Sequence, residues 1–112
     1  MIRMGFVMTV HPTAHAEYQR RHDELWPEMA ALLAEHGVRS YTIHLDPRRS
    51  LLFAHVEAES KERWDAIAES PVCRRWWAFM RELMETHPDG SPVSEPLREV
   101  FHLESPGTSR EA

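Results

Sequence analysis

The middle of the chain, residues 38–58, runs VRSYTIHLDPRRSLLFAHVEA. Residues 38–46 and 51–58 are rich in the apolar and β-branched side chains that favour strands. Asp46-Pro47 ends the first of these runs, and the polar link that follows is short enough for a hairpin turn. This stretch therefore predicts two neighbouring antiparallel strands at the centre of the fold.

Helical segments are predicted on both sides of the hairpin. Between Thr13, an expected N-cap, and Gly37, just past the helix end, apolar residues recur at helical spacing. Pro27 lies inside this segment and should kink the helix or split it in two, because proline lacks an N–H and clashes with the preceding turn. After the hairpin, Ser60 is expected to cap one helix, and Ser70 to precede a second that begins with proline.

A strand is predicted near each end of the chain. Within residues 2–11 every second residue from Met4 to Val10 is apolar, as in a strand with one apolar face. Residues 97–103 also alternate and predict a last strand, after a structured loop at 87–96. The order β-α-β-β-α-β is the ferredoxin-like plan, an α+β fold with one antiparallel sheet and helices on one face.

The length of 112 residues suits one domain. We expect residues 1–103 to form it and residues 104–112 to be a flexible polar tail. A sheet covered on one face leaves the other exposed, and the first and third strands carry apolar residues on both faces, including Val7 and Phe53. Burial of the second face against another copy predicts a homodimer with twofold symmetry.

The composition excludes several classes of protein. The net charge is −5 with His neutral, which argues against a nucleic-acid partner because phosphate binding needs clustered Lys and Arg. The single cysteine, Cys73, cannot form an internal disulfide, so nothing demands an oxidising compartment. We find no signal peptide and no apolar run near the roughly 18 residues of a membrane helix. We therefore expect no membrane association and a cytoplasmic location.

Two polar residues lie on the face of the first helix that should be buried. Tyr18 and His22 are four residues apart, so they stack on one face. Both could simply be satisfied by hydrogen bonds within the core. Alternatively, they mark a pocket between helix and sheet in which His22 acts as an acid–base group, because the ordinary pKa of histidine lies near neutrality. The spacing alone leaves both interpretations open.

Three further aromatic residues could belong to such a pocket. Trp76 and Trp77 are adjacent, so either one is in the core and one at an interface, or the pair forms a platform for a sugar ring. Tyr41 lies in the second strand, and if it shares the face of Ile43 and Leu45 its hydroxyl needs a partner from the protein or a ligand. A strand tyrosine with a hydrated tip is the simpler alternative.

The eight histidines are scattered and form no metal-binding motif. The sequence contains no H-E-x-x-H run and no Cys-x-x-Cys. His44 and His55 could be neighbours across the hairpin, but two ligands do not make a metal site. A Gly-rich phosphate loop and a G-x-S-x-G elbow are also absent from the sequence. We therefore expect neither a metal nor a cofactor.

Over about residues 1–103 the chain closely resembles the L-rhamnose mutarotase family. The matching segments are 6–8, 18–22, 25–28, 41–46, 51–54, 62–64, 72–77, 88–89, 91–94 and 99–101. The combination of Tyr-x-x-x-His, Trp-Pro-Glu and Trp-Trp is specific, whereas each motif alone would be weak. The resemblance implies a dimeric α/β barrel and an isomerase that interconverts the α and β anomers of L-rhamnose without a cofactor, supporting rhamnose catabolism.

The resemblance also implies roles for the candidate residues. His22 would be the proton donor, and Tyr18, Tyr41, Trp76 and Trp77 would line the sugar site. Opening a pyranose ring needs one proton removed from the anomeric hydroxyl and one delivered to the ring oxygen, and each positioned acid or base contributes roughly 10²–10⁴-fold. We expect His22 to protonate the ring oxygen.

The sequence leaves the opposing base open. Asp46, Glu28, a tyrosine or a water molecule could take the proton of the anomeric hydroxyl. The chain also departs from the family in the 87–96 loop, where His87 and Gly90 stand in place of asparagines. If this loop closes the pocket, sugar preference could differ.

Two other functional classes are alternatives to an anomer isomerase. One is a small cofactor-binding oxygenase or haem-degrading enzyme with the same dimeric architecture. The other is a non-catalytic sugar-binding or regulatory module. The fold alone cannot separate these classes from an anomer isomerase, because one fold hosts many functions. The motif match favours the isomerase.

Overall fold

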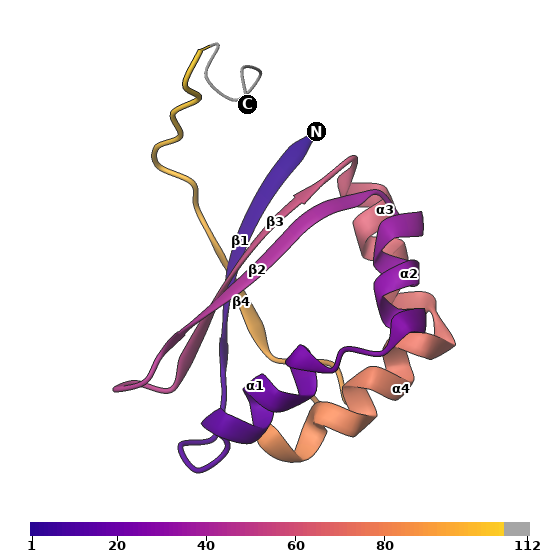
Figure 1. The fold of residues 1–112 in the computed structure, drawn as a ribbon, viewed down its shortest axis with the longest axis vertical. Helices are drawn as coiled ribbons and strands as arrows, with labels where there is room; N and C mark the ends of the chain where they lie inside the picture. Colours follow the sequence, from indigo (N-terminus) through magenta and orange to yellow (C-terminus); the bar gives the residue numbers. More distant parts are fainter. Residues whose placement is uncertain (107–112) are drawn as a thin grey trace.

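The computed structural model describes residues 1–106 of the chain. Its sheet contains β1 (Ile2–Thr9), β2 (Val38–Asp46), β3 (Leu51–Ala58) and β4 (Ser94–Leu97), in the order β2-β3-β1-β4. All neighbouring strands are antiparallel. Figure 1 shows the helices gathered on one side of this twisted sheet. The predicted ferredoxin-like α+β fold, with helices on one face, is confirmed.

Over the described residues 1–106, the helical layer consists of four α-helices, two of which continue into a short 3-10 turn. They are α1 (His15–Asp23), α2 (Pro27–Glu35), α3 (Lys61–Ala66) with η1 (Ile67–Glu69), and α4 (Pro71–Met80) with η2 (Arg81–Leu83).

Pro27 splits the first helical segment in two, as predicted. It is the first residue of α2, where its missing N–H costs no helical hydrogen bond. The predicted cap at Thr13 is wrong: the N-cap of α1 is Ala14, whose side chain makes no capping hydrogen bond. The chain turns tightly here instead, since the Ala14 N–H donates to the His11 carbonyl at 2.9 Å.

The other predicted helix ends are confirmed. The Ser60 hydroxyl accepts from the Arg63 N–H, and the Ser70 hydroxyl accepts from the Val72 N–H, so both helices after the hairpin begin with a serine cap. Gly37 follows α2 at φ +83°, a left-handed conformation that favours glycine.

The register places alternate strand residues on the helix-covered face. Tyr41 pairs with Val56 and Ile43 with Ala54, and paired residues in an antiparallel sheet share a face. Tyr41 therefore points to the same side as Ile43, which was the condition for it to face a pocket. Val56 is fully buried in this layer, whereas Phe53 on the opposite face is 39% exposed.

The last strand was placed too late in the chain. β4 spans Ser94–Leu97 and pairs with Gly5–Met8 of β1, so the predicted loop at 87–96 is wrong at its end. Residues 98–103, although alternating, form no strand. Backbone pairing with β1 ends at Leu97, and beyond it the side chain of Glu99 still contacts this strand, accepting from Arg3 at 2.9 Å. The segment then runs away from the helices (Figure 1).

The predicted boundary between the domain (residues 1–103) and the tail (residues 104–112) lies just after this segment. Of the predicted tail, residues 104–106 contain no helix or strand, and residues 107–112 lie outside the described residues. The structure therefore leaves the 1–103 domain boundary as a prediction.

Candidate active site

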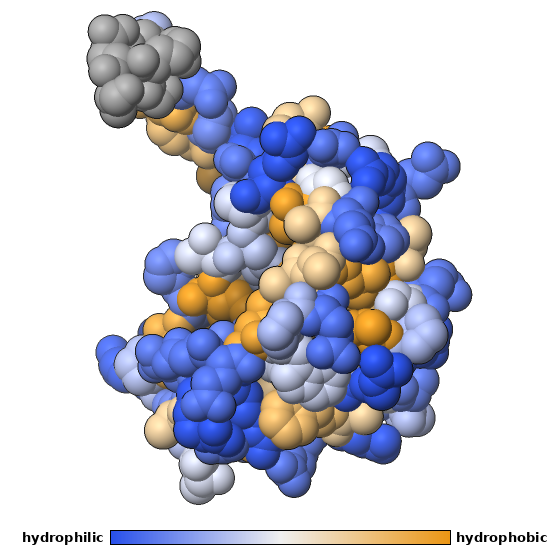
Figure 2. All heavy atoms as spheres, turned by 45° about the vertical axis from the view of Figure 1, so that its right-hand side comes forward, coloured by the Kyte–Doolittle hydropathy of each residue, from blue (hydrophilic) through white to orange (hydrophobic). Residues whose placement is uncertain are grey.

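A cavity of about 570 Å³ lies between the helices and the sheet. Tyr18 and His22 line it from α1, Tyr41 from β2, and Trp76 and Trp77 from α4. The five residues singled out in the sequence thus meet at one cavity. Apolar residues from the sheet and helices form most of the remaining wall, and Figure 2 shows apolar residues gathered across the middle of the helical side of the molecule.

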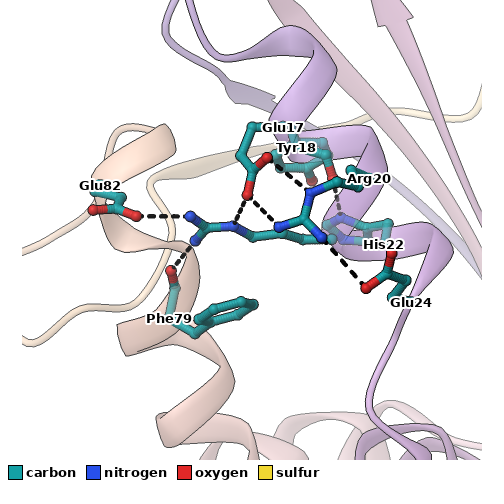
Figure 3. Close-up of polar contacts among 8 residues, drawn as sticks. Glu17, Tyr18, Arg20, His22, Glu24, Phe79 and Glu82 are labelled. Carbon is teal, nitrogen blue, oxygen red and sulfur yellow. Dashed lines mark hydrogen bonds and ion pairs between the residues drawn. The ribbon is translucent and has the colours of Figure 1, made fainter.

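One turn of α1 positions the tyrosine and histidine. The rings of Tyr18 and His22 are stacked, with centroids 4.4 Å apart. The His22 Nδ1 lies 3.0 Å from the Tyr18 carbonyl oxygen (Figure 3). Because a carbonyl only accepts, Nδ1 must carry the hydrogen and donate it. The neutral ring therefore has a proton-free Nε2, which is a Brønsted base.

Helix α4 supplies the facing wall. Trp76 is buried and meets His22 edge to face, with ring centroids 5.4 Å apart. Trp26 and Phe79 pack on the same indole at 5.1 and 5.7 Å between centroids. Trp77, next in sequence, is half-buried and also lines the cavity. The two adjacent tryptophans thus line one cavity, although their side chains leave the helix in different directions.

Tyr41 closes the cavity from the sheet. Its ring contacts Phe6 at 6.3 Å and Trp64 at 5.7 Å between centroids, both in edge-on arrangements. About a third of its surface, 37%, is accessible. Its position in the strand fixes its direction, since the helix-covered face of β2 is the one that looks into the cavity.

Burial decides the electrostatics of the site. Removal from water lowers the pKa of His22 below its ordinary value of 6.5, only partly opposed by the hydrogen bond to the Tyr18 carbonyl and by the charge of Asp23. The same effect raises the pKa of Tyr18 and Tyr41 well above the usual range. At neutral pH the site therefore holds a neutral imidazole and two protonated phenols.

Several polar atoms in the cavity have no protein partner. Within residues 1–106, no hydrogen bond is made by the Tyr18 hydroxyl, by the indole N–H of Trp76 or Trp77, or by the His22 Nε2. Among the described residues, every side-chain nitrogen or oxygen that is fully buried has a hydrogen-bond partner, so these unpartnered atoms are not fully buried. They must therefore reach accessible space, where a ligand with hydroxyl groups can hydrogen-bond to them.

Two residues considered as the opposing base lie elsewhere. The Asp46 carboxylate accepts from the backbone N–H groups of Arg48 and Arg49 and from the Arg49 guanidinium, which lowers its pKa. Glu28 points to solvent, 3.7 Å from Arg75. Neither belongs to the cavity wall.

The structure adds cavity residues that sequence reasoning missed. His15 lines the cavity, and its Nε2 lies 2.8 Å from the Ser50 hydroxyl. It precedes His22 by seven residues, two turns along the same helix face, so periodicity could have found it. From the proline-rich loop, Gly90 and Pro92 contribute to the wall. Gly90, one of the two residues of the 87–96 loop noted as departing from the family, therefore borders the cavity, whereas His87 does not.

A metal site and a membrane-spanning helix, both expected to be absent, can be examined in residues 1–106. Among residues 1–106, no three His, Cys, Asp or Glu side chains are grouped in a way that could hold a metal ion. The lone thiol of Cys73 is buried, and burial raises its pKa to about 11. Over the same residues, no helix has the length and apolar character needed to cross a bilayer.

Comparisons with known proteins, in sequence and in structure, find L-rhamnose mutarotases. A family model described as L-rhamnose mutarotase matches residues 3–103. The L-rhamnose mutarotases of Escherichia coli O8 (strain IAI1) and Yersinia pestis (strain Pestoides F) are each 58% identical, over 92% and 93% of this chain and 99% and 100% of theirs. The crystal structure of L-rhamnose mutarotase from Formosa agariphila superposes with a TM-score of 0.85 at 38% identity, covering 93% of this chain and all of that one.

Fold and cavity together define a ferredoxin-like α+β protein with a partly buried histidine in an aromatic pocket. With the family model matching most of its length, the chain belongs to the L-rhamnose mutarotase family.

Proposed function

We propose that this protein is an enzyme that interconverts the α and β anomers of L-rhamnose. Family membership over residues 3–103 and the cavity with a base at its centre support this activity. The observation that carries the chemistry is the His22–Tyr18 hydrogen bond, because it leaves Nε2 of a neutral imidazole free for proton transfer. The same family match favours this activity over an oxygenase or a non-catalytic sugar-binding module.

The reaction needs two proton transfers in each direction. In ring opening, the anomeric hydroxyl loses its proton, the bond between the anomeric carbon and the ring oxygen breaks, and the ring oxygen gains a proton. This gives the open-chain aldehyde and a free hydroxyl. Rotation about the neighbouring C–C bond presents the other face of the carbonyl, and closing reverses both transfers.

His22 can perform both transfers in turn. Its proton-free Nε2 accepts the proton of the anomeric hydroxyl, and the resulting imidazolium donates it to the ring oxygen. The two oxygens are bonded to the same carbon, so one nitrogen placed beside that carbon reaches both. His22 is thus the proton donor to the ring oxygen, and it is also the base that the sequence left open.

The aromatic residues bind and orient the sugar. Because their pKa values are raised, Tyr18 and Tyr41 stay protonated and donate hydrogen bonds to sugar oxygens. Trp76 and Trp77 pack against the C–H surface of the ring, and their N–H groups can reach hydroxyls. Most of the remaining wall is apolar, and its low local dielectric strengthens these polar interactions.

A matched pair of histidine variants tests the proposal. We expect His22→Gln to slow anomer exchange of L-rhamnose by about 10²–10⁴-fold, measured by saturation-transfer NMR. His36→Gln is the control, because His36 Nδ1 makes the same 3.0 Å contact with a backbone carbonyl four residues earlier but does not line the cavity. Parental exchange in the His22 variant would refute the assignment.

The predicted homodimer belongs to the same proposal. The outer face of the sheet presents Phe53 and Leu97, 39% and 45% exposed, and beyond it Val100, Phe101 and Leu103 are 71–80% exposed. Such an apolar surface favours burial against a second copy related by a twofold axis. A cytoplasmic location remains a prediction from the sequence.

A further inference from the structure

Arg21, the residue before the proposed catalytic histidine, joins two helices of the site. Its Nε donates to Glu17 at 2.7 Å within α1, and its two terminal nitrogens donate to the Phe79 carbonyl of α4 at 2.5 Å and to Glu82 of η2 at 2.7 Å. Its guanidinium carbon also lies 4.3 Å from the centroid of the Phe79 ring. Figure 3 shows Glu82 and Phe79 on the facing helical segment, opposite Glu17 and His22.

The burial of Arg21 indicates which of these contacts matter. Its side chain is only 11% exposed, whereas that of Glu82 is 70% exposed, so the ion pair with Glu82 is screened and weak. Phe79 is 39% exposed, so its contacts with Arg21 are better protected from water than the ion pair with Glu82. Its carbonyl is at the C-terminal end of α4, where helical carbonyls lack partners and a cation is favoured. The planar fork of arginine suits this arrangement, because one group bonds Glu17 and the carbonyl while stacking on the ring.

Within residues 1–106, no other side-chain hydrogen bond or ion pair connects α1 with α4 and η2. These helices carry opposite walls of the cavity. The Phe79 ring packs on Trp76 at 5.7 Å, and Trp76 meets His22 at 5.4 Å. A continuous series of contacts thus runs from Arg21 through Phe79 and Trp76 back to His22.

We propose that Arg21 is a positioning residue that holds the Trp76 wall against His22 and so keeps the imidazole oriented and shielded from water. Arg21 does not line the cavity and need not touch the sugar. Its effect on the rate rests on the proposed mutarotase function, whereas its effect on the environment of His22 does not.

Neighbouring arginines provide a matched test. We expect Arg21→Ala to lower kcat by about 10- to 100-fold with a smaller rise in KM, because a displacement of about 1 Å can cost this much. The His22 pKa, followed by NMR titration, should move up toward 6.5. Arg20→Ala is the control, since the Arg20 side chain is 54% exposed and, among residues 1–106, pairs with only Glu17 and Glu24 of its own helix segment. It should change neither quantity.

Two further measurements separate positioning from general destabilisation. Guanidinium ion at a concentration below that which unfolds the protein should restore activity to Arg21→Ala and not to His22→Gln. Arg21→Lys keeps the charge without the fork, so it should fold and still lose kcat.

Folded Arg21 variants with parental kcat and parental His22 titration would overturn the proposal, as would equal losses in the Arg20 variant. If the parent protein itself fails to exchange anomers, the mutarotase function fails. The His22 titration then still decides the role of Arg21.

Discussion

His22 and His36 show how surroundings decide what one side chain does. Both donate from Nδ1 to the backbone carbonyl four residues earlier, at 3.0 Å. Only His22 meets the Trp76 indole, edge to face, at the cavity. Burial there removes the imidazole from water and lowers the pKa of His22. The local hydrogen bond sets the tautomer in both cases, but only His22 lines the cavity, which is why we propose it, and not His36, as the base.

This difference predicts the pH dependence of the reaction. In the proposed mechanism the neutral imidazole is the reactive form, so kcat should fall as pH decreases through the His22 pKa, with a midpoint below 6.5. In Trp76→Ala, water reaches the imidazole, its charged form is less penalised, and the midpoint should move to higher pH. The pH–rate profile from NMR exchange measures both.

Trp64→Ala is the control for this shift, because Trp64 packs on Phe6 and Tyr41 rather than on His22. An acid limb that is the same in all three proteins would show that Trp76 does not shield the imidazole. A rate that rises on acidification would show that the protonated form is the reactive one.

At the scale of the elements, the ends of helices position the site. Pro27 separates α2 from α1, so the helix that carries His22 ends at Asp23. Gly37 ends α2 and joins it to the sheet, with its carbonyl accepting from the Glu59 N–H at 3.0 Å. A Cβ at Gly37 would lie 3.0 Å from the Glu59 Cβ, in addition to the positive φ.

We therefore expect Gly37→Ala to lower the free energy of unfolding by about 1–2 kcal/mol from the backbone conformation, with a further cost from crowding. Gly90→Ala is the matched comparison, because Gly90 has φ +93° but no atom within 4 Å of the added Cβ. Urea unfolding of both variants should show the greater loss for Gly37. Equal losses would mean that the contact with Glu59 relaxes freely.

At the scale of the whole molecule, no element within residues 1–106 covers the outer face of the sheet. The helices cover the side that bears Val56 and Leu52, both almost fully buried, while Phe53 between them in sequence faces the other way. The segment after β4 leaves the body of the molecule with Phe101 78% exposed (Figure 1). An unshielded apolar face on a single chain is costly in water, which is the physical basis of the proposed dimer.

Adding a charge to that face should dissociate the dimer. We expect the parent chain to sediment as a dimer and Phe53→Glu as a monomer, because a buried unpaired carboxylate is strongly unfavourable. Ala31→Glu places the same charge on an exposed position of α2, in the helical layer, and should leave the mass unchanged. A monomeric parent would contradict the proposal, and so would a Phe53 variant that remains dimeric.

Much of the fold was predictable because its signals are local. The hairpin, the serine caps at Ser60 and Ser70 and the break at Pro27 each depend on residues a few positions apart. The last strand was misplaced because alternation shows only that a segment can form a strand. Pairing with β1, a distant segment, decided that the strand ends at Leu97.

The candidate site divides in the same way. The spacing of Tyr18 and His22 puts both on one helix face, and the family motifs point to Tyr41 and the tryptophan pair, so neither step needs tertiary contacts. Family resemblance, rather than spacing, supplies their roles. Those roles, including that of His22 as a proton donor, remain to be tested.

The sequence by itself determined the order of the elements, the positions of all but the last strand and which faces are apolar, since these follow from side-chain periodicity along the chain. Only the tertiary structure decided that Trp76 shields His22, that Asp46 and Glu28 lie outside the cavity, and that Arg21 bonds α1 to α4. The physical reason is that these relations join residues far apart in the sequence, and their energies depend on burial and distance that exist only once the layers have packed.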